Sequence, residues 1–243
     1  MNLISKNLYR LVIRQLIIVF VALILPIRAN AAESGINTSY EFHKLSFNGS
    51  TVSYIETNKL KPKLVVADGF DSVKNLTDST NGIIGINAGA WNTAGKTDFT
   101  FANGLWYSID DTAYVGDSLI FTKDGRLFSS GYDYTTCDTL ANYNPEWIVT
   151  GYNAVIYDTY CKNLDWNTKH DRSFIGQLND GSYIAGTATN MTYEDMYKFA
   201  KSTWQDNIRI LYNLDGGGSC NLYLKGCPNT STRDVKSAIC FCE

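Results

Sequence analysis

The stretch Tyr212-Asn-Leu-Asp-Gly-Gly-Gly-Ser-Cys-Asn-Leu-Tyr-Leu-Lys-Gly-Cys227 places one aspartate and three consecutive glycines between two apolar segments. The first segment ends just before Asp215, and the second begins after Ser219. A tight turn usually needs a single glycine, and each glycine costs roughly 0.5–1 kcal/mol of ordering entropy. Three in a row therefore favour a binding loop with Asp215 pointing into it over a plain turn that the aspartate caps.

The rest of the chain has the pattern of short strands separated by tight turns. Three Asn-Gly or Asp-Gly pairs are flanked by apolar segments, as in β-hairpins: Asn48-Gly49, Asp124-Gly125 and Asp180-Gly181. Residues 193–204 carry apolar side chains at a period of 3.6, and Thr192 is placed to cap them, which predicts a helix. The expected fold is a single α+β domain of largely antiparallel sheet with a few packed helices.

The N-terminal segment has the composition of a secretory signal peptide. Lys6, Arg10 and Arg14 precede an apolar run over residues 16–25, and Ala29-Asn30-Ala31 fits the small-x-small cleavage rule. The run is shorter than the ~20 residues of a membrane-spanning helix, so we expect cleavage rather than an uncleaved anchor. We assign residues 1–31 to the signal peptide and 32–243 to a domain that is secreted, extracellular or periplasmic, with no stable membrane anchor.

The charge of the secreted part excludes a broad class of partners. Residues 1–31 hold four of the 21 basic side chains and no acidic one, so 17 basic and 24 acidic residues remain, a net charge of −7. No cluster of lysine and arginine survives in that part of the sequence. A nucleic-acid partner is therefore not expected, because such proteins need a basic face.

The six cysteines all follow the signal peptide. They are Cys137, Cys161, Cys220, Cys227, Cys240 and Cys242. An even count in a secreted chain favours disulfides, although six cysteines allow 15 connectivities. The alternative, a metal site, is less favoured because the Cys-x-Cys spacing at 240 and 242 is not that of a zinc knuckle.

The glycine motif resembles the signature of a known family. Asn213-Leu-Asp-Gly-Gly-Gly-Ser219 is similar to the corresponding motif of phosphodiester glycosidases, the N-acetylglucosamine-1-phosphodiester alpha-N-acetylglucosaminidase type. Three more segments resemble that family in the same order: Ile86-Asn-Ala-Gly-Ala-Trp91, Asp171-Arg-Ser-Phe-Ile-Gly176 and Arg233-Asp-Val-Lys-Ser-Ala-Ile239. The resemblance covers about residues 40–241. Its departures, such as Ala88 and Asp234, bear on the substrate's identity more than on the fold.

The resemblance implies a hydrolase that cleaves the glycosidic bond of a sugar-1-phosphodiester and releases free sugar and a phosphomonoester. Asp215 is the candidate that would stabilise C1, attack it or activate water there, since the transition state has oxocarbenium character. Arg172 and Arg233 are candidate phosphate ligands because a guanidinium makes paired hydrogen bonds, although either arginine could instead form structural salt bridges. The candidate substrate-binding residues are Asn87, Gly216, Gly217, Gly218 and Ser219.

Several alternatives stay open at this point. Asp98, Asp171 and Asp180 are all possible second carboxylates, and Asn87 is also a plausible turn residue. No cofactor is expected, and a metal ion is neither indicated nor excluded. The expected partner is a sugar phosphodiester or a cell-surface glycan. The alternative function is a non-catalytic module that binds carbohydrate or cell-wall polymer through the same pocket.

The resemblance also bears on the disulfides. Cys137 and Cys161 lie outside the family-like segments and flank a single stretch, so we expect them to pair. The other four, Cys220, Cys227, Cys240 and Cys242, would then pair among themselves and tie the glycine loop to the last strand.

Overall fold

The computed structural model describes residues 31–91, 97–109, 117–131, 136–157, 167–229, 231 and 233–243. The expected signal peptide lies outside these residues, except for Ala31. Across the described ranges, no helix combines the length and the apolar character that a membrane span requires.

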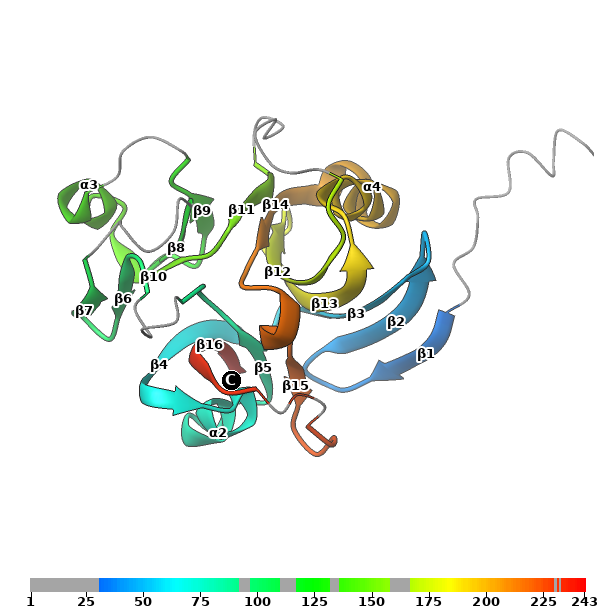
Figure 1. Cartoon of the computed structure of the whole chain (residues 1–243), viewed down its shortest axis with the longest axis horizontal. Coiled ribbons are helices and arrows are strands. Elements are labelled where there is room, and N and C mark those ends of the chain that lie inside the picture. The colour runs from blue at the N-terminus through cyan, green and yellow to red at the C-terminus, as the bar shows by residue number, and fades with distance from the viewer. Residues whose placement is uncertain are drawn as a thin grey trace, which may run out of the picture.

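Three antiparallel β-sheets make up the described structure (Figure 1). The largest has seven strands in the order β1 (Ala31–Ile36), β2 (Glu41–Phe47), β3 (Ser50–Thr57), β13 (Tyr183–Met191), β12 (His170–Leu178), β14 (Ile208–Asn213) and β11 (Asn153–Ile156). The second has five, in the order β7 (Leu105–Ser108), β6 (Thr100–Ala102), β10 (Pro145–Thr150), β8 (Ser118–Thr122) and β9 (Leu127–Ser129). The third has four, in the order β15 (Leu222–Leu224), β5 (Ile84–Asn87), β16 (Val235–Cys242) and β4 (Lys61–Asp71).

Each sheet packs on one of the three described α-helices. Helix α4 (Tyr193–Trp204) covers the seven-stranded sheet through Met196, Phe199 and Ala200. Helix α3 (Cys137–Ala141) inserts Leu140 against the five-stranded sheet, and α2 (Val73–Ser79) lays Val73 on the four-stranded sheet. Two short 3₁₀ turns complete the described elements, η1 (Gln205–Asn207) and η2 (Gly217–Ser219).

The three sheets share one apolar core on their inner faces. Strand β16 shows the division, because its residues alternate between the two sides. Ile239 and Phe241 enter the shared core, whereas Ala238 and Cys240 face α2. Ile175 of the seven-stranded sheet and Trp147 of the five-stranded sheet lie in the same core, so the sheets form a single domain. The expected fold class is confirmed.

The predicted local elements are confirmed at most of their positions. Asn48 and Gly49 both have positive φ, 47° and 83°, as a two-residue hairpin between β2 and β3 requires. Helix α4 has the predicted bounds, and the Thr192 hydroxyl accepts a hydrogen bond from the Asp195 N–H at 2.9 Å. The period predicts an apolar face of Tyr193, Met196, Tyr197, Ala200 and Trp204. The structure buries Phe199 as well, and Tyr197 only in part.

The ends of three strands from two sheets meet beside the glycine run. The Leu214 N–H donates to the Ser173 carbonyl of β12 at 2.8 Å, and the Asp215 N–H donates to the Ala88 carbonyl after β5 at 3.0 Å. In Figure 1 the turn after β14 lies near the middle of the molecule, where it leads into β15. The glycine motif is thus positioned by both the seven-stranded and the four-stranded sheets.

Candidate functional site

Asp215 is fixed through its backbone and half-buried at the end of β14. Its N–H is bonded to Ala88, and its carbonyl accepts the Asn87 amide N–H at 2.7 Å. One carboxylate oxygen accepts the N–H of Gly216 at 2.9 Å. The carboxylate therefore has a defined direction at the lip of the turn.

The surroundings of Asp215 change its acidity. Burial raises the pKa of the carboxyl group above its ordinary value, while the Ser219 hydroxyl, the Gly216 N–H and the Arg233 guanidinium oppose that rise. A carboxylate with a raised pKa is a stronger base than an exposed aspartate. The position suits a group that takes a proton or meets positive charge.

The three glycines differ in backbone conformation and in what a Cβ would meet at each position. Gly217 has a φ of +59°, in the left-handed region that favours glycine. A Cβ on Gly216 would lie 2.7 Å from the Asp171 carbonyl oxygen. A Cβ on Gly218 would lie 2.9 Å from Nη1 of Arg233. Gly216 is therefore required by a close backbone approach and Gly217 by its positive φ, whereas the nearest atom at Gly218 is the movable end of the Arg233 side chain.

Arg233 lies against the glycine turn and is exposed to solvent. Its guanidinium stacks over the Trp91 ring at 4.8 Å from the centroid, and its charge lowers the pKa of Asp215. Among the described residues, no carboxylate forms an ion pair with it. Arg233 thus presents a cationic group next to the candidate carboxylate.

Arg172 occupies a different environment and is only 6% exposed. Its Nε donates to the Met191 carbonyl at 3.1 Å, and its Nη2 donates to the Thr168 carbonyl at 3.0 Å. The guanidinium also stacks over Tyr193 at 4.0 Å from the ring centroid. The two predicted arginines are therefore not equivalent, because Arg172 is anchored in protein while Arg233 faces solvent.

Cys220 is partly buried near Ser173, Asp171, Asp215 and Arg172. Burial raises the pKa of its thiol to about 12, the Ser173 hydroxyl lowers it, and the charges of Asp171 and Asp215 raise it further. The thiol is therefore protonated at neutral pH and is a poor nucleophile. Because the Arg172 charge also acts on this thiol, Cys220 connects Arg172 with the Asp215 region.

Asn87 is completely buried, and both ends of its amide are occupied by protein groups. Its Nδ2 donates to the Asp215 carbonyl, while its Oδ1 accepts from the Ser173 hydroxyl at 2.6 Å and from the Asn221 N–H at 3.1 Å. The predicted sugar contact would need a free amide edge. The geometry instead favours a positioning role for Asn87.

Several buried oxygens near the turn lack a hydrogen bond of regular geometry within the described part of the chain. They are Ser219 Oγ, Asn213 Oδ1 and Asn221 Oδ1. Ser219 nevertheless faces Asp215, since its hydroxyl lowers the pKa of that carboxyl. Buried polar atoms normally have a hydrogen-bond partner. Buried atoms without one at a candidate site therefore indicate where a ligand or water binds. Sequence reasoning missed Asn221 and Ser173, which only spatial contacts reveal.

The three open carboxylates are placed differently. Asp171 precedes Arg172 on β12, accepts the Asn190 N–H at 2.8 Å and acts on Cys220. Asp98 is 3% exposed and lies next to the Trp91–Thr97 bridge. Asp180 accepts the Ser182 N–H in the β12–β13 turn, at the opposite end of β12 from Arg172. The structure brings Asp171 near the turn and keeps Asp180 away.

The disulfides predicted among Cys220, Cys227, Cys240 and Cys242 are not formed in the described structure, where these four cysteines carry free thiols. Cys161 lies outside the described residues, so its pairing with Cys137 stays a prediction. Cys240 and Cys242 both turn toward α2, with Sγ 3.7 Å from the hydroxyl oxygens of Thr77 and Thr80. Cys220 instead points at the candidate site, and Cys227 is exposed after β15, so the four thiols do not converge.

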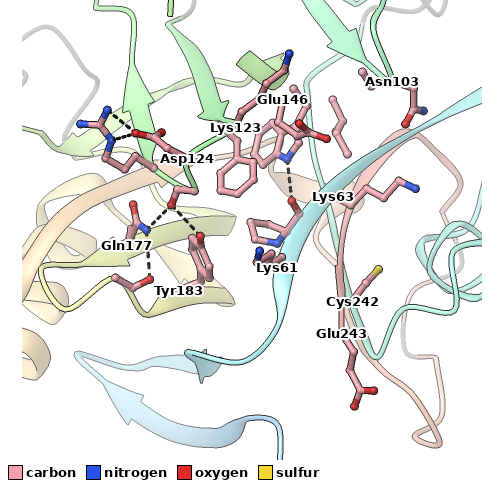
Figure 2. A pocket seen from close by; sticks show the side chains of 18 residues that line it. Lys61, Lys63, Asn103, Lys123, Asp124, Glu146, Gln177, Tyr183, Cys242 and Glu243 are labelled. Atoms are coloured by element: carbon pink, nitrogen blue, oxygen red, sulfur yellow. Dashed lines mark hydrogen bonds and ion pairs between the residues drawn. The ribbon is translucent and has the colours of Figure 1, made fainter. Parts of the chain in front are cut away.

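A separate cavity of about 700 Å³ is lined by the first residues of β4, the β8–β9 turn and the end of β12 (Figure 2). Its lining includes Trp147, Gln177, Tyr183 and Glu243, and none of the predicted catalytic or substrate-binding residues. Within the described ranges, no three His, Cys, Asp or Glu side chains gather as metal ligands would. The candidate site is thus the Asp215 turn, and the cavity is a distinct feature.

Comparison with known proteins supports this reading. The sequence profile described as phosphodiester glycosidase matches residues 52–242. No curated protein matches significantly. Among solved structures, the zebrafish N-acetylglucosamine-1-phosphodiester alpha-N-acetylglucosaminidase catalytic domain, auto-inhibited by its pro-peptide, is similar in fold, with a TM-score of 0.64 and 14% identity over 90% of this chain and 85% of that one. A hypothetical protein from Synechocystis has a TM-score of 0.67 and 11% identity over 87% of this chain and 64% of that one.

The profile match extends from β3 to the end of β16 and includes Asp215, both arginines and the whole glycine run. It therefore covers the five-stranded and four-stranded sheets, most of the seven-stranded sheet, and the turn that lies between the seven-stranded and four-stranded sheets. The chain belongs to the phosphodiester glycosidase family, and it is a hydrolase of that kind.

Proposed function

We propose that the protein is a secreted hydrolase that cleaves the glycosidic bond of a sugar-1-phosphodiester at the Asp215 turn. The C1–O bond breaks, the phosphate leaves with the bonding electrons, and water adds to C1. The products are a free sugar and a phosphomonoester. The observation that carries the proposal is a half-buried carboxylate with a raised pKa beside a guanidinium that has no carboxylate partner among the described residues.

Asp215 is the group that acts at C1. A negative charge there stabilises the oxocarbenium character of the transition state, and the same oxygens are able to accept a proton from water. The Gly216 N–H holds one oxygen and the Ser219 hydroxyl faces the same carboxylate, so the group is fixed in place for the reacting atoms. An acidic phosphate is a good leaving group, so this step depends little on a second carboxylate.

Arg233 is the group that binds the phosphate. Its exposed guanidinium offers the paired donors that suit a phosphate oxygen pair, and it stands next to Gly218. The Ser219 hydroxyl and the N–H groups of Gly217 and Gly218 lie in the same turn and support the anion. Each of these groups is placed within one short segment, so the site is compact.

Arg172 and Asn87 hold the segments that carry Asp215 and the turn next to Arg233, and are not proposed to contact the substrate. Arg172 fixes the start of β12 against the start of α4 through Met191 and Tyr193. Asn87 holds the Asp215 carbonyl and the Ser173 hydroxyl at once. We assign both residues to positioning, with Arg172 also adding positive charge beneath the phosphate site.

The expected location and substrate source follow from the N-terminal segment and the charge. A signal peptide over residues 1–31 would export the domain, and its cleavage would leave an acidic protein without a membrane anchor. An extracellular or periplasmic hydrolase of this chemistry would act on a cell-surface glycan that contains sugar-1-phosphate linkages.

The test is incubation of the purified protein with a panel of sugar-1-phosphodiesters that differ in the sugar. Free sugar and phosphomonoester should appear in equal amounts with at least one member, because one bond is cleaved per turnover. Release of a sugar phosphate instead would place the cleavage on the other side of the phosphate and refute the proposal. Binding without release would leave only the carbohydrate-binding alternative.

A further inference from the structure

Four side chains form a row that leads away from the Asp215 turn. The row consists of Arg233, Trp91, Phe70 and Lys236, and we call it the cation–aromatic row. The Arg233 guanidinium lies 4.8 Å from the Trp91 ring centroid, the Trp91 and Phe70 centroids are 4.7 Å apart, and the Lys236 ammonium lies 4.9 Å from the Phe70 ring. Two cations thus enclose two rings in an unbroken series.

Three separate chain segments build the row. Phe70 comes from β4, Trp91 follows β5, and Lys236 lies on β16 beside the position where Val235 pairs with Asp71. Arg233 precedes β16 and also packs on Gly218. Because these strands are neighbours in the four-stranded sheet, the row is fixed by the fold at the edge of the site.

The row is more exposed than a stabilising cluster would be. Phe70 is 45% exposed, one of few large apolar side chains so placed in the described structure. A cation–π contact at an exposed site stabilises the fold only weakly, which does not explain an exposed phenylalanine. Neither Arg233 nor Lys236 forms an ion pair with any described carboxylate, although acidic residues outnumber basic ones in the chain.

The order of the groups gives the row a direction relative to the substrate. With Asp215 at C1 and Arg233 at the phosphate, the next groups outward lie on the leaving-group side of the scissile bond. Trp91 and Phe70 follow there, and Lys236 comes last. A leaving group that reaches along the row meets an apolar surface first and a second positive charge after it.

We propose that the cation–aromatic row is a leaving-group subsite that selects phosphodiesters whose leaving group carries a ring and a further anionic group. The C–H-bearing face of a sugar ring is apolar and packs on aromatic side chains, while the ammonium of Lys236 attracts the next phosphate or carboxylate. The favoured substrate class is therefore an anionic glycan of repeating sugar phosphates rather than a small diester. This inference rests on the proposed function.

The test compares a short and a long substrate with the same scissile bond. The short one is the methyl phosphodiester of N-acetylglucosamine 1-phosphate, and the long one is a trimer of N-acetylglucosamine joined through phosphodiester bonds. We expect Lys236→Gln and Phe70→Ala each to lower kcat/KM for the trimer about tenfold and to change it less than twofold for the methyl diester. Lys44→Gln and Tyr143→Ala are matched controls, since both residues are exposed, Lys44 lies on β2, and Tyr143 packs near Phe128 of β9.

Binding separates failure of this inference from failure of the proposed function. Calorimetric titration of the trimer into Asp215→Asn protein should give a Kd that Lys236→Gln raises about tenfold and that 0.5 M salt weakens. This binding is measurable even where no sugar is released. Equal effects on both substrates, or a trimer Kd that Lys236→Gln and Phe70→Ala leave unchanged, would overturn the subsite.

Discussion

The Asp215 turn and the 700 Å³ cavity differ in how completely their polar groups are paired. In the cavity, the Gly125 carbonyl accepts from both Gln177 and Tyr183, and the Trp147 N–H donates to the Pro62 carbonyl (Figure 2). Arg126 is paired with Asp124, and Lys63 and Lys123 point to different sides of the opening. At the Asp215 turn, buried oxygens lack regular partners and a guanidinium stands without a carboxylate among the described residues.

The comparison shows that volume and chemistry mark different places in this molecule. The cavity has a volume of about 700 Å³, and the hydrogen bonds named above join protein groups to one another. The turn instead holds buried oxygens whose bonding is incomplete. Incomplete bonding costs stability and is retained where a ligand completes it. Substitutions at the turn should therefore change activity, and substitutions at the cavity should change stability.

The largest effect is expected at Asp215. Asp215→Asn keeps the shape of the side chain but removes the negative charge, so kcat should fall by about 10³-fold or more. The measurement is kcat on the best phosphodiester, with calorimetry to show that the substrate still binds. A loss below tenfold, which is only ~1.4 kcal/mol of barrier, would remove Asp215 from the centre of the mechanism.

The same substitution should raise stability at neutral pH. The pKa of Asp215 is raised in the folded protein, so its protonated form is stabilised by folding and its charged form is penalised. That penalty is absent below the ordinary aspartate pKa of about 3.9 and appears as the pH rises through the folded pKa. Urea unfolding should therefore show Asp215→Asn to be more stable than wild type at pH 7 and equal to it at pH 3. If the variant and wild type unfold at the same urea concentration at both pH values, burial does not destabilise the charged carboxylate.

An intermediate effect is expected from the arginines, and it should differ between them. Arg233→Lys keeps the charge but loses the paired donors, so kcat/KM for a phosphodiester should fall about 10–100-fold. A neutral p-nitrophenyl glycoside of the same sugar should be affected far less, and the Tm should hardly change.

Arg172→Lys is the companion variant. It loses two carbonyl bonds and the stacking on Tyr193, so it should lower the Tm and reduce turnover of both substrates by similar factors. If the Arg233 variant also affects both substrates equally, that arginine contacts the sugar or is structural, and our phosphate assignment is wrong.

The smallest effect on activity is expected at the cavity. Tyr183→Phe removes the 2.8 Å hydrogen bond to the Gly125 carbonyl, which should cost about 0.5–1.5 kcal/mol of unfolding free energy. Turnover of the phosphodiester should stay within twofold, because the cavity lies away from the Asp215 turn. A tenfold change in kcat/KM would show that the two regions are coupled.

Local patterns predicted local structure well. The Asn48-Gly49 hairpin and the bounds of α4 follow from turn chemistry and helix periodicity, which act over a few residues. The short helices α2 and α3 were not predicted, since each has at most seven residues and too few turns to show a period. Phe199 was missed because the helix packs on a sheet that the sequence does not locate.

The candidate site residues came from the sequence motif and remain a prediction, whereas their arrangement in space comes only from the structure. The sequence motif singled out Asp215 and the glycines, but the contrast between Arg172 and Arg233 depends on which side chains stack on them. The exclusion of Asp180 depends on the register of β12, which places it a whole strand length from Arg172. Phe70 lies outside the family-like segments, and Lys236 lies inside one without being singled out there, because their proximity comes from strand pairing between β4 and β16.

The amide of Asn87 links the geometry of the site to the packing of two sheets against each other. Asn87 ends a strand of the four-stranded sheet, whereas Ser173 and the segment leading to Asp215 belong to the seven-stranded sheet. The Asn87 side chain therefore holds the backbone that carries the Asp215 carboxylate and also joins the two sheets. If the two sheets separate at this contact, the Asp215 carboxylate moves with its backbone. Heating should therefore abolish turnover while most strands within each sheet are still paired.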